Sequence, residues 1–285
     1  MRWRSGRRSQ HIEDRRGRRT LRGVKGGGLG AIIIALIAIY FGVDPALFMQ
    51  GQLTNITPSD YPQQASRSTA DDELRDFVSV VLADTEDTWH ELFRNQLNRT
   101  YEEPTLVLFS GAVQSACGFN QAAVGPFYCP ADHKVYIDLD FYQDLKDHFR
   151  APGDFAQAYV IAHEVGHHVQ TLLGISQRIR TVRKKVGQTE GNELSVRQEL
   201  QADCFAGVWA HNANRARHVL EAGDIEEGLN AASAIGDDRI QRRARGYVAP
   251  ESFTHGSSAQ RVRWFKRGLA SGDLQQCDTF QARQL

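Results

Sequence analysis

The most constraining feature of this chain is an apolar segment, YVIAHEVGHHVQTLL (159–173), that carries ionisable side chains at a fixed spacing. His163 and His167 are four residues apart, so on a helix both imidazoles lie on one face and can reach a single metal ion. Glu164 projects about 100° around the helix from His163, where its carboxylate can contact a metal-bound water without being a ligand. Histidines without a partner would be costly in such an apolar run. The segment therefore predicts a helix that carries a metal site.

A catalytic zinc ion takes a third protein ligand and keeps its fourth position open. Gln170 and Leu173 stand where a longer zinc-binding pattern would need Gly and His, so the third ligand comes from elsewhere. Glu199 and Asp203 share one face of a later helix, among small and apolar side chains that do not fit a solvated acidic face. We expect Glu199 to be the ligand and Asp203 the acceptor that fixes a histidine tautomer. Asp203 and His211 are the alternative ligands.

The charge of the chain is unevenly distributed. The sequence has 285 residues and a formal net charge of zero, with 34 basic and 34 acidic residues. Residues 1–25 contain ten basic and two acidic residues, which leaves 24 basic and 32 acidic residues in the remainder. The chain is therefore a basic N-terminal segment joined to an acidic body.

An uncharged apolar run, GGGLGAIIIALIAIYFGV (26–43), follows the basic segment. Its length corresponds to roughly 27 Å of helix, close to the thickness of a bilayer core. Basic residues before the run and none directly after it predict one transmembrane helix, with a cytoplasmic N-terminus and an extracytoplasmic body. The expected location is the cytoplasmic (inner) membrane, single-pass.

Three alternatives compete with this anchor. A cleaved signal peptide would end in small residues, and no such site follows Val43. A nucleic-acid-binding tail would use the same arginines, but Trp3 is almost its only aromatic residue, which argues against nucleic acid as a partner. A buried core helix is the third reading. We favour the uncleaved anchor.

The sequence predicts an α+β body, mostly helical, with a small β-sheet that precedes the central helix. The expected divisions are a basic cytoplasmic tail (1–25), a transmembrane anchor (26–43), a polar linker (44–70) and the body (71–285). Helix capping boxes are expected at Asp154/Gln157 and Ser195/Gln198. The expected helices are 71–93, 154–174, 195–211, 217–244 and 259–269, with strands at 105–109 and 134–140 and a loop or exposed helix at 176–193.

The strand candidate KVYIDLD (134–140) alternates apolar and polar residues, which predicts a half-exposed strand. Such a strand could pair with an extended substrate. Tyr136, Ile137 and Asp138 are the expected substrate-binding residues of this edge strand.

The four cysteines form no Cys-x-x-Cys pair, so a cysteine zinc site is not expected. An even number of cysteines outside the cytoplasm indicates disulfides. Cys117 and Cys129 flank a Gly/Pro-containing loop and are the natural local pair, which leaves Cys204 and Cys277. Four buried thiols in a cytosolic protein are the alternative.

His-Glu-x-x-His followed by Glu-x-x-x-Asp resembles the pattern of gluzincin metallopeptidases. The chain from 105 onward is similar to a bacterial neutral zinc metallopeptidase family of single-span membrane proteins. The segments that carry this resemblance are ACGFNQAAVGPFYCPADHKVYIDLDFY (116–142), AHEVGHHVQ (162–170), RQELQADCFAGVWA (197–210) and SFTHGSSAQRVRWFKRG (252–268). The resemblance implies a zincin-like domain with one Zn²⁺ held by His163, His167 and Glu199, and Glu164 as the catalytic base.

A second resemblance concerns Thr254-His255-Gly256 and Arg261, which are similar to the Thr-His-Pro and downstream Arg of membrane-associated gluzincins. Gly256 replaces the Pro. His255 or Arg261 could donate a hydrogen bond to the oxyanion that forms during amide hydrolysis. The alternative is that His255 neighbours a helix N-cap and Arg261 is a surface charge.

These observations predict a membrane-anchored zinc metallopeptidase. Its zinc-activated water would attack a peptide bond of a protein or peptide substrate, with Glu164 as general base. A zinc-stabilised binding or scaffold protein with little proteolytic activity is the competing hypothesis, and a nucleic-acid-binding membrane protein is a third. The sequence leaves the substrate preference and the oligomeric state open.

Overall fold

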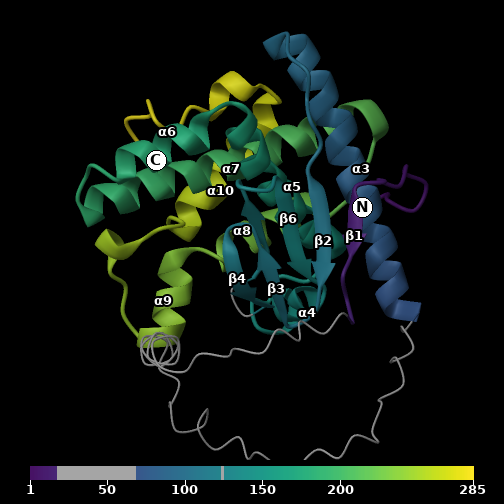
Figure 1. Ribbon diagram of the computed structural model, residues 1–285, viewed down its shortest axis with the longest axis horizontal. Helices are drawn as coiled ribbons and strands as arrows, with labels where there is room; N and C mark the ends of the chain where they lie inside the picture. The colour runs from purple at the N-terminus through teal and green to yellow at the C-terminus, as the bar shows by residue number, and fades with distance from the viewer. Residues whose placement is uncertain (18–68, 123–124) are drawn as a thin grey trace, which may run out of the picture.

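The computed structural model describes residues 1–17, 69–122 and 125–285, which form an α+β domain in which helices predominate (Figure 1). The predicted fold class is confirmed in this respect. The strands are β1 (Ile12–Asp14), β2 (Thr105–Phe109), β3 (Ala112–Ser115), β4 (Gly118–Gln121), β5 (Phe127–Cys129) and β6 (Lys134–Asp138). The helices are α3 (Thr69–Leu97), α4 (Asp140–Asp147), α5 (Asp154–Leu172), α6 (Ile175–Arg183), α7 (Gln188–Arg217), α8 (Asp224–Ala234), α9 (Asp237–Arg245) and α10 (Ser258–Ser271), with 3-10 turns η2 (Pro250–Ser252) and η3 (Leu274–Cys277).

Four strands form the main sheet in the order β1-β2-β6-β5. β1, β2 and β6 run parallel, and β5 runs antiparallel to β6. The continuous apolar sequence TLVLF suits β2, because four of its five residues are buried inside the sheet. β3 and β4 form a separate antiparallel hairpin.

The prediction of a half-exposed edge strand at 134–140 is wrong in its placement. β6 lies inside the sheet with β2 on one side and β5 on the other. Tyr136, Ile137 and Asp138 are all buried, at 1%, 0% and 4% exposure. Tyr136 is paired on both sides, with Val107 of β2 and Phe127 of β5, whereas Ile137 and Asp138 are paired with β2 alone. The edge strands of this sheet are β1 and β5.

Residues 1–17 belong to the domain, which differs from the prediction of a separate basic tail over 1–25. Figure 1 shows β1 at the edge of the sheet beside α3. The β1 residues Ile12 and Asp14 lie opposite Leu106 and Leu108 of β2. Three strand residues are too few for a periodic signal, which is why sequence reasoning missed this strand.

Close contacts between glycines and neighbouring backbone bring three helices together. A Cβ atom on Gly166 of α5 would lie 3.0 Å from the Ala202 carbonyl oxygen of α7. A Cβ on Gly268 of α10 would lie 1.9 Å from the Cys204 carbonyl oxygen of α7. Glycine is therefore needed where α5 and α10 pack on α7.

One helix start and the caps of two helices differ from the predictions. α7 begins at Gln188 rather than at Ser195, whose hydroxyl bonds the Gly191 carbonyl within the helix. α5 begins at Asp154 as predicted, but its N-cap is Gly153, which has no side chain, and the Asp154 carboxylate accepts a hydrogen bond from the amino group of Met1.

The expected capping boxes are absent at these two helix starts, and one forms at Ser257 and Gln260 before α10. The predicted helix over 217–244 is two helices, α8 and α9. Gly236 separates them, and a Cβ atom there would lie 2.4 Å from the backbone nitrogen of Ser258.

Both predicted disulfides are present. Cys117 and Cys129 join the β3–β4 hairpin to β5, and Cys204 and Cys277 join α7 to η3. The second disulfide closes a sequence separation of 73 residues and is fully buried at both ends. It fixes the C-terminal segment on the helix that carries Glu199.

Among the helices of the described residues, none has the length and apolar character needed to cross a membrane. The expected anchor (26–43) and nearly all of the expected linker (44–70) lie outside the described residues.

Candidate metal centre

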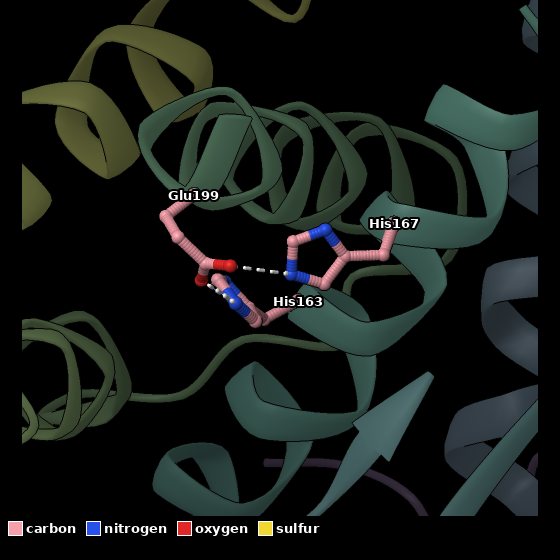
Figure 2. Close-up of side chains that lie close together, drawn as sticks. All are labelled: His163, His167 and Glu199. Atoms are coloured by element: carbon pink, nitrogen blue, oxygen red, sulfur yellow. Dashed lines mark hydrogen bonds and ion pairs between the residues drawn. The ribbon is translucent and has the colours of Figure 1, made fainter. Parts of the chain in front are cut away.

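Three potential metal ligands converge from α5 and α7. Figure 2 shows the imidazoles of His163 and His167 facing the carboxylate of Glu199. Nε2 of His163 lies 3.2 Å from one carboxylate oxygen, and Nε2 of His167 lies 3.4 Å from the other. One donor atom from each residue lies within 4.8 Å of the others. Two imidazole nitrogens and one carboxylate oxygen are a donor set of catalytic zinc sites, so these residues fit one zinc ion.

Each histidine is oriented by a hydrogen bond on its other ring nitrogen. Nδ1 of His163 lies 2.9 Å from Oδ1 of Asp203, and a carboxylate can only accept, so Nδ1 carries the proton. Nδ1 of His167 lies 2.9 Å from Oε1 of Gln170, whose amide nitrogen donates to the Gln198 carbonyl. Each Nε2 therefore faces Glu199, and a binding metal ion would displace any proton on it.

Arg261 lies behind the ligands and is only 2% exposed. Its Nε and Nη2 atoms donate to the two carboxylate oxygens of Asp203 at 2.8 Å each, and Tyr159 donates its hydroxyl to the same carboxylate. The guanidinium is therefore committed to Asp203. Arg261 also lines the cleft, and its burial shows that the alternative of a surface charge is wrong.

The electrostatics of the cluster favour a cation. Burial alone would lower the pKa of His163, but the Asp203 carboxylate and hydrogen bonds to Asp203 and Glu199 raise it to about 9. Burial would raise the pKa of Glu199, but the adjacent His167 and His163 hold it well below its usual range. Glu199 is therefore ionised, as a metal ligand must be.

Glu164 faces the same cleft as the ligand cluster. The cleft has a volume of about 940 Å³, and its lining includes His163, Glu164, His167 and Glu199. Its walls also contain a group of apolar side chains: Phe127, Phe141, Phe149, Ile235 and Ile240. Glu164 is 7% exposed, so its carboxylate has limited contact with solvent.

His255 lines the cleft and is held by Asp237. One carboxylate oxygen of Asp237 lies 3.2 Å from Nδ1 of His255, and the other accepts from the backbone N–H groups of residues 254–256. The hydrogen bond to Asp237 raises the pKa of His255. Gly256 has a φ of 89°. Proline cannot adopt this angle, so the backbone conformation here is incompatible with the proline of the Thr-His-Pro pattern.

Edge strand β5 borders the cleft through Phe127 and Tyr128. Within the described residues, β6 occupies one side of β5 and no strand occupies the other. Strand order depends on long-range pairing, so sequence alternation alone could not show that β6 lies inside the sheet and β5 at its edge.

A second group of acids, Asp154, Asp224 and Glu227, also brings three carboxylates together. The amino group of Met1 lies among them, 2.6 Å from Asp154 and 3.3 Å from Asp224. The group therefore binds an ammonium in this structure.

Sequence reasoning brought together the residues of the ligand cluster but missed Gln170, Tyr159 and Asp237. Gln170 was noted only for not being a glycine. Its position three residues after His167, on the same helical face, was the available signal. Tyr159 had a similar signal, since it precedes His163 by one turn.

A His-Glu-x-x-His helix joined by a glutamate from a second helix defines a class of zinc metallopeptidase sites. Residues 1–280 match the family described as "Putative neutral zinc metallopeptidase", and the chain belongs to this family. "Uncharacterized protein YpfJ" of Escherichia coli (strain K12) is 52% identical over 291 aligned positions, which cover 98% of this chain and 99% of that protein. "Uncharacterized protein Rv2575" of Mycobacterium tuberculosis (strain ATCC 25618 / H37Rv) is 46% identical over 195 positions, 65% of each chain. No solved structure matches the chain.

Proposed function

We propose that this protein is a zinc-dependent endopeptidase that hydrolyses peptide bonds in protein or peptide substrates. The observation that carries the proposal is the convergence of His163, His167 and Glu199 beside Glu164 in a cleft of about 940 Å³. A purely structural zinc site is closed by four protein ligands. A three-donor cluster that opens into a cleft supports a catalytic site instead.

His163, His167 and Glu199 would hold the zinc ion. When bound, zinc supplies Lewis-acid chemistry, which makes a water nucleophilic near neutral pH and polarises a carbonyl oxygen. Glu164 would accept the proton of the attacking water and return it to the nitrogen of the departing amine. Its place beside the ligands and its limited exposure suit this role.

His255 is the candidate donor to the oxyanion. Asp237 fixes Nδ1 of His255, which leaves Nε2 to donate when the ring is protonated, and the raised pKa favours that form. Arg261 and Tyr159 act through Asp203, which holds the orientation of His163.

Strand β5 is the candidate substrate-binding edge. An extended peptide could add to its open side, beside the apolar walls of the cleft. This proposal replaces β6 as the substrate-binding strand.

We also propose that the domain lies outside the cytoplasm and that residues 26–43 hold it at the inner membrane without separating it from residues 1–17. The two disulfides support an oxidising compartment. Cell fractionation with and without residues 26–43 tests the attachment: loss of membrane association on deletion is expected, and unchanged association would refute it.

Glu164→Gln tests the enzymatic proposal, because it removes the base and keeps the ligands. Zinc content and cleavage of an unbiased peptide library would be measured for the full chain, with the exposed Glu190→Gln as matched control. We expect both variants to bind zinc and only the control to cleave. Zinc binding without cleavage by the wild type would favour a zinc-stabilised scaffold protein.

A further inference from the structure

The N-terminal segment completes the sheet of the domain. The backbone N–H of Leu106 donates to the His11 carbonyl at 2.8 Å, and that of Arg15 donates to the Leu108 carbonyl at 2.8 Å. These bonds satisfy the edge of β2, which would otherwise present unpaired backbone groups beside an apolar core. Residues 1–17 thus contribute the edge strand that pairs with β2.

Basic side chains of this segment pair with acids. Four of the acids belong to the body, on α3 and next to α8, and two belong to β1 itself. The pairs are Arg2–Glu221, Arg4–Glu73, Arg7–Glu86, Arg8–Asp76, Arg15–Glu13 and Arg16–Asp14. The basic N-terminus and acidic body therefore have complementary charges within one domain, a second explanation for arginines that had indicated a membrane topology.

Glu86 of α3 shows how closely the two parts fit. Its side chain is only 2% exposed. It pairs with Arg7 at 2.8 Å, accepts from the Ser9 hydroxyl at 2.5 Å and lies 2.9 Å from Nδ1 of His11. All three partners come from the N-terminal segment, so the segment both covers and satisfies this carboxylate.

Apolar contacts fix the same segment. Trp3 is 8% exposed and its ring lies edge-on to Phe77 of α3, with centroids 5.4 Å apart. Arg2 donates its backbone N–H to the Val219 carbonyl at 2.8 Å, between α7 and α8. The family match also begins at residue 1.

We propose that residues 1–17 are an integral strand of the domain and lie on the same side of any membrane as residues 69–285. The interaction surface is the β2 edge with the adjoining face of α3, and its partner is the chain's own N-terminal segment. One membrane crossing between the two parts would place them on opposite sides and make every contact above impossible. The cytoplasmic N-terminus expected from the arginine cluster is therefore replaced by an N-terminus that shares the compartment of the domain.

Site-directed labelling of the full chain in cells of its host tests this inference without disturbing the fold. Gln10 in the segment and Thr189 in the body are both exposed and would be replaced singly by Cys. A membrane-impermeant maleimide would be applied to intact spheroplasts and, as control, after detergent treatment, when both positions must react. Equal behaviour in spheroplasts, with both labelled or both protected, is expected. Labelling of Thr189→Cys while Gln10→Cys reacts only after detergent would overturn the proposal.

Discussion

The carboxylate of Asp203 on α7 accepts a hydrogen bond of 2.9 Å from Nδ1 of His163 on α5, and the same carboxylate accepts a hydrogen bond from Nε of Arg261 on α10. This relationship links three helices to the orientation of one metal ligand. His163 is therefore positioned by a carboxylate on α7 that a guanidinium on α10 holds in place.

Asp203→Asn tests this link, because it keeps the size of the side chain and removes the negative charge that both Arg261 and His163 contact. We expect zinc affinity to fall by about 10- to 100-fold, measured by competition with a chromophoric chelator. Asp147→Asn on the exposed face of α4 is the matched control. Equal affinities of the two variants would show that Asp203 does not orient His163.

His255→Ala tests the donor proposed for the oxyanion. We expect kcat to fall by about 10²- to 10³-fold, with little change in KM or zinc content, because His255 is not a ligand. His148→Ala is the control, since its side chain is 76% exposed. An unchanged kcat would show that His255 does not donate a hydrogen bond to the oxyanion.

Gly268→Ala tests the close packing of α10 on α7. The added Cβ would lie 1.9 Å from the Cys204 carbonyl oxygen, so the helices must separate. We expect a loss of about 1–3 kcal/mol in the free energy of unfolding, measured by denaturant titration. Gly191→Ala within α7 meets only Nε of Arg183, at 3.9 Å, and should not lower the stability; similar losses in both variants would contradict the packing.

Arg7→Glu tests the contribution of the N-terminal segment to stability. The substitution places a like charge beside the buried Glu86, and we expect a loss of about 1–3 kcal/mol in the free energy of unfolding. Arg94→Glu is the control, because Arg94 is exposed and lies on α3, the helix that carries Glu86. Equal stability of Arg7→Glu and wild type would mean that the segment is not docked in solution.

The acid dependence of stability provides a separate test of β1. Hydrogen bonds from Arg15 and Lys134 lower the pKa of Glu13 from its ordinary value of 4.5 to about 2. Because the folded-state pKa is lowered, this contribution is present above pH 4.5 and is lost as the pH falls toward 2. The difference in melting temperature between wild type and Glu13→Gln should therefore shrink over this range. A difference that stays constant with pH would contradict the pairing.

Local sequence patterns predicted the fold class, the central helix and the grouping of His163 with Glu199, because helical spacing determines which side chains share a face. They did not predict what depends on long-range pairing. The KVYID segment was recognised as a strand, but its place between β2 and β5 follows from sheet order. Arg261 was singled out by its spacing from His255, whereas its contacts depend on how α10 packs on α7. The N-terminal arginines resembled a topology signal because their acidic partners lie as far away as Glu221.

Zinc content tests the central claim most directly. Wild type, Glu199→Ala and the exposed control Glu193→Ala would be dialysed against metal-free buffer and analysed by mass spectrometry for zinc. We predict about one zinc ion per chain in wild type and the control, and loss of most of the zinc in Glu199→Ala. Wild type without zinc, or Glu199→Ala with as much zinc as the control, would contradict the assignment of His163, His167 and Glu199 as the metal ligands.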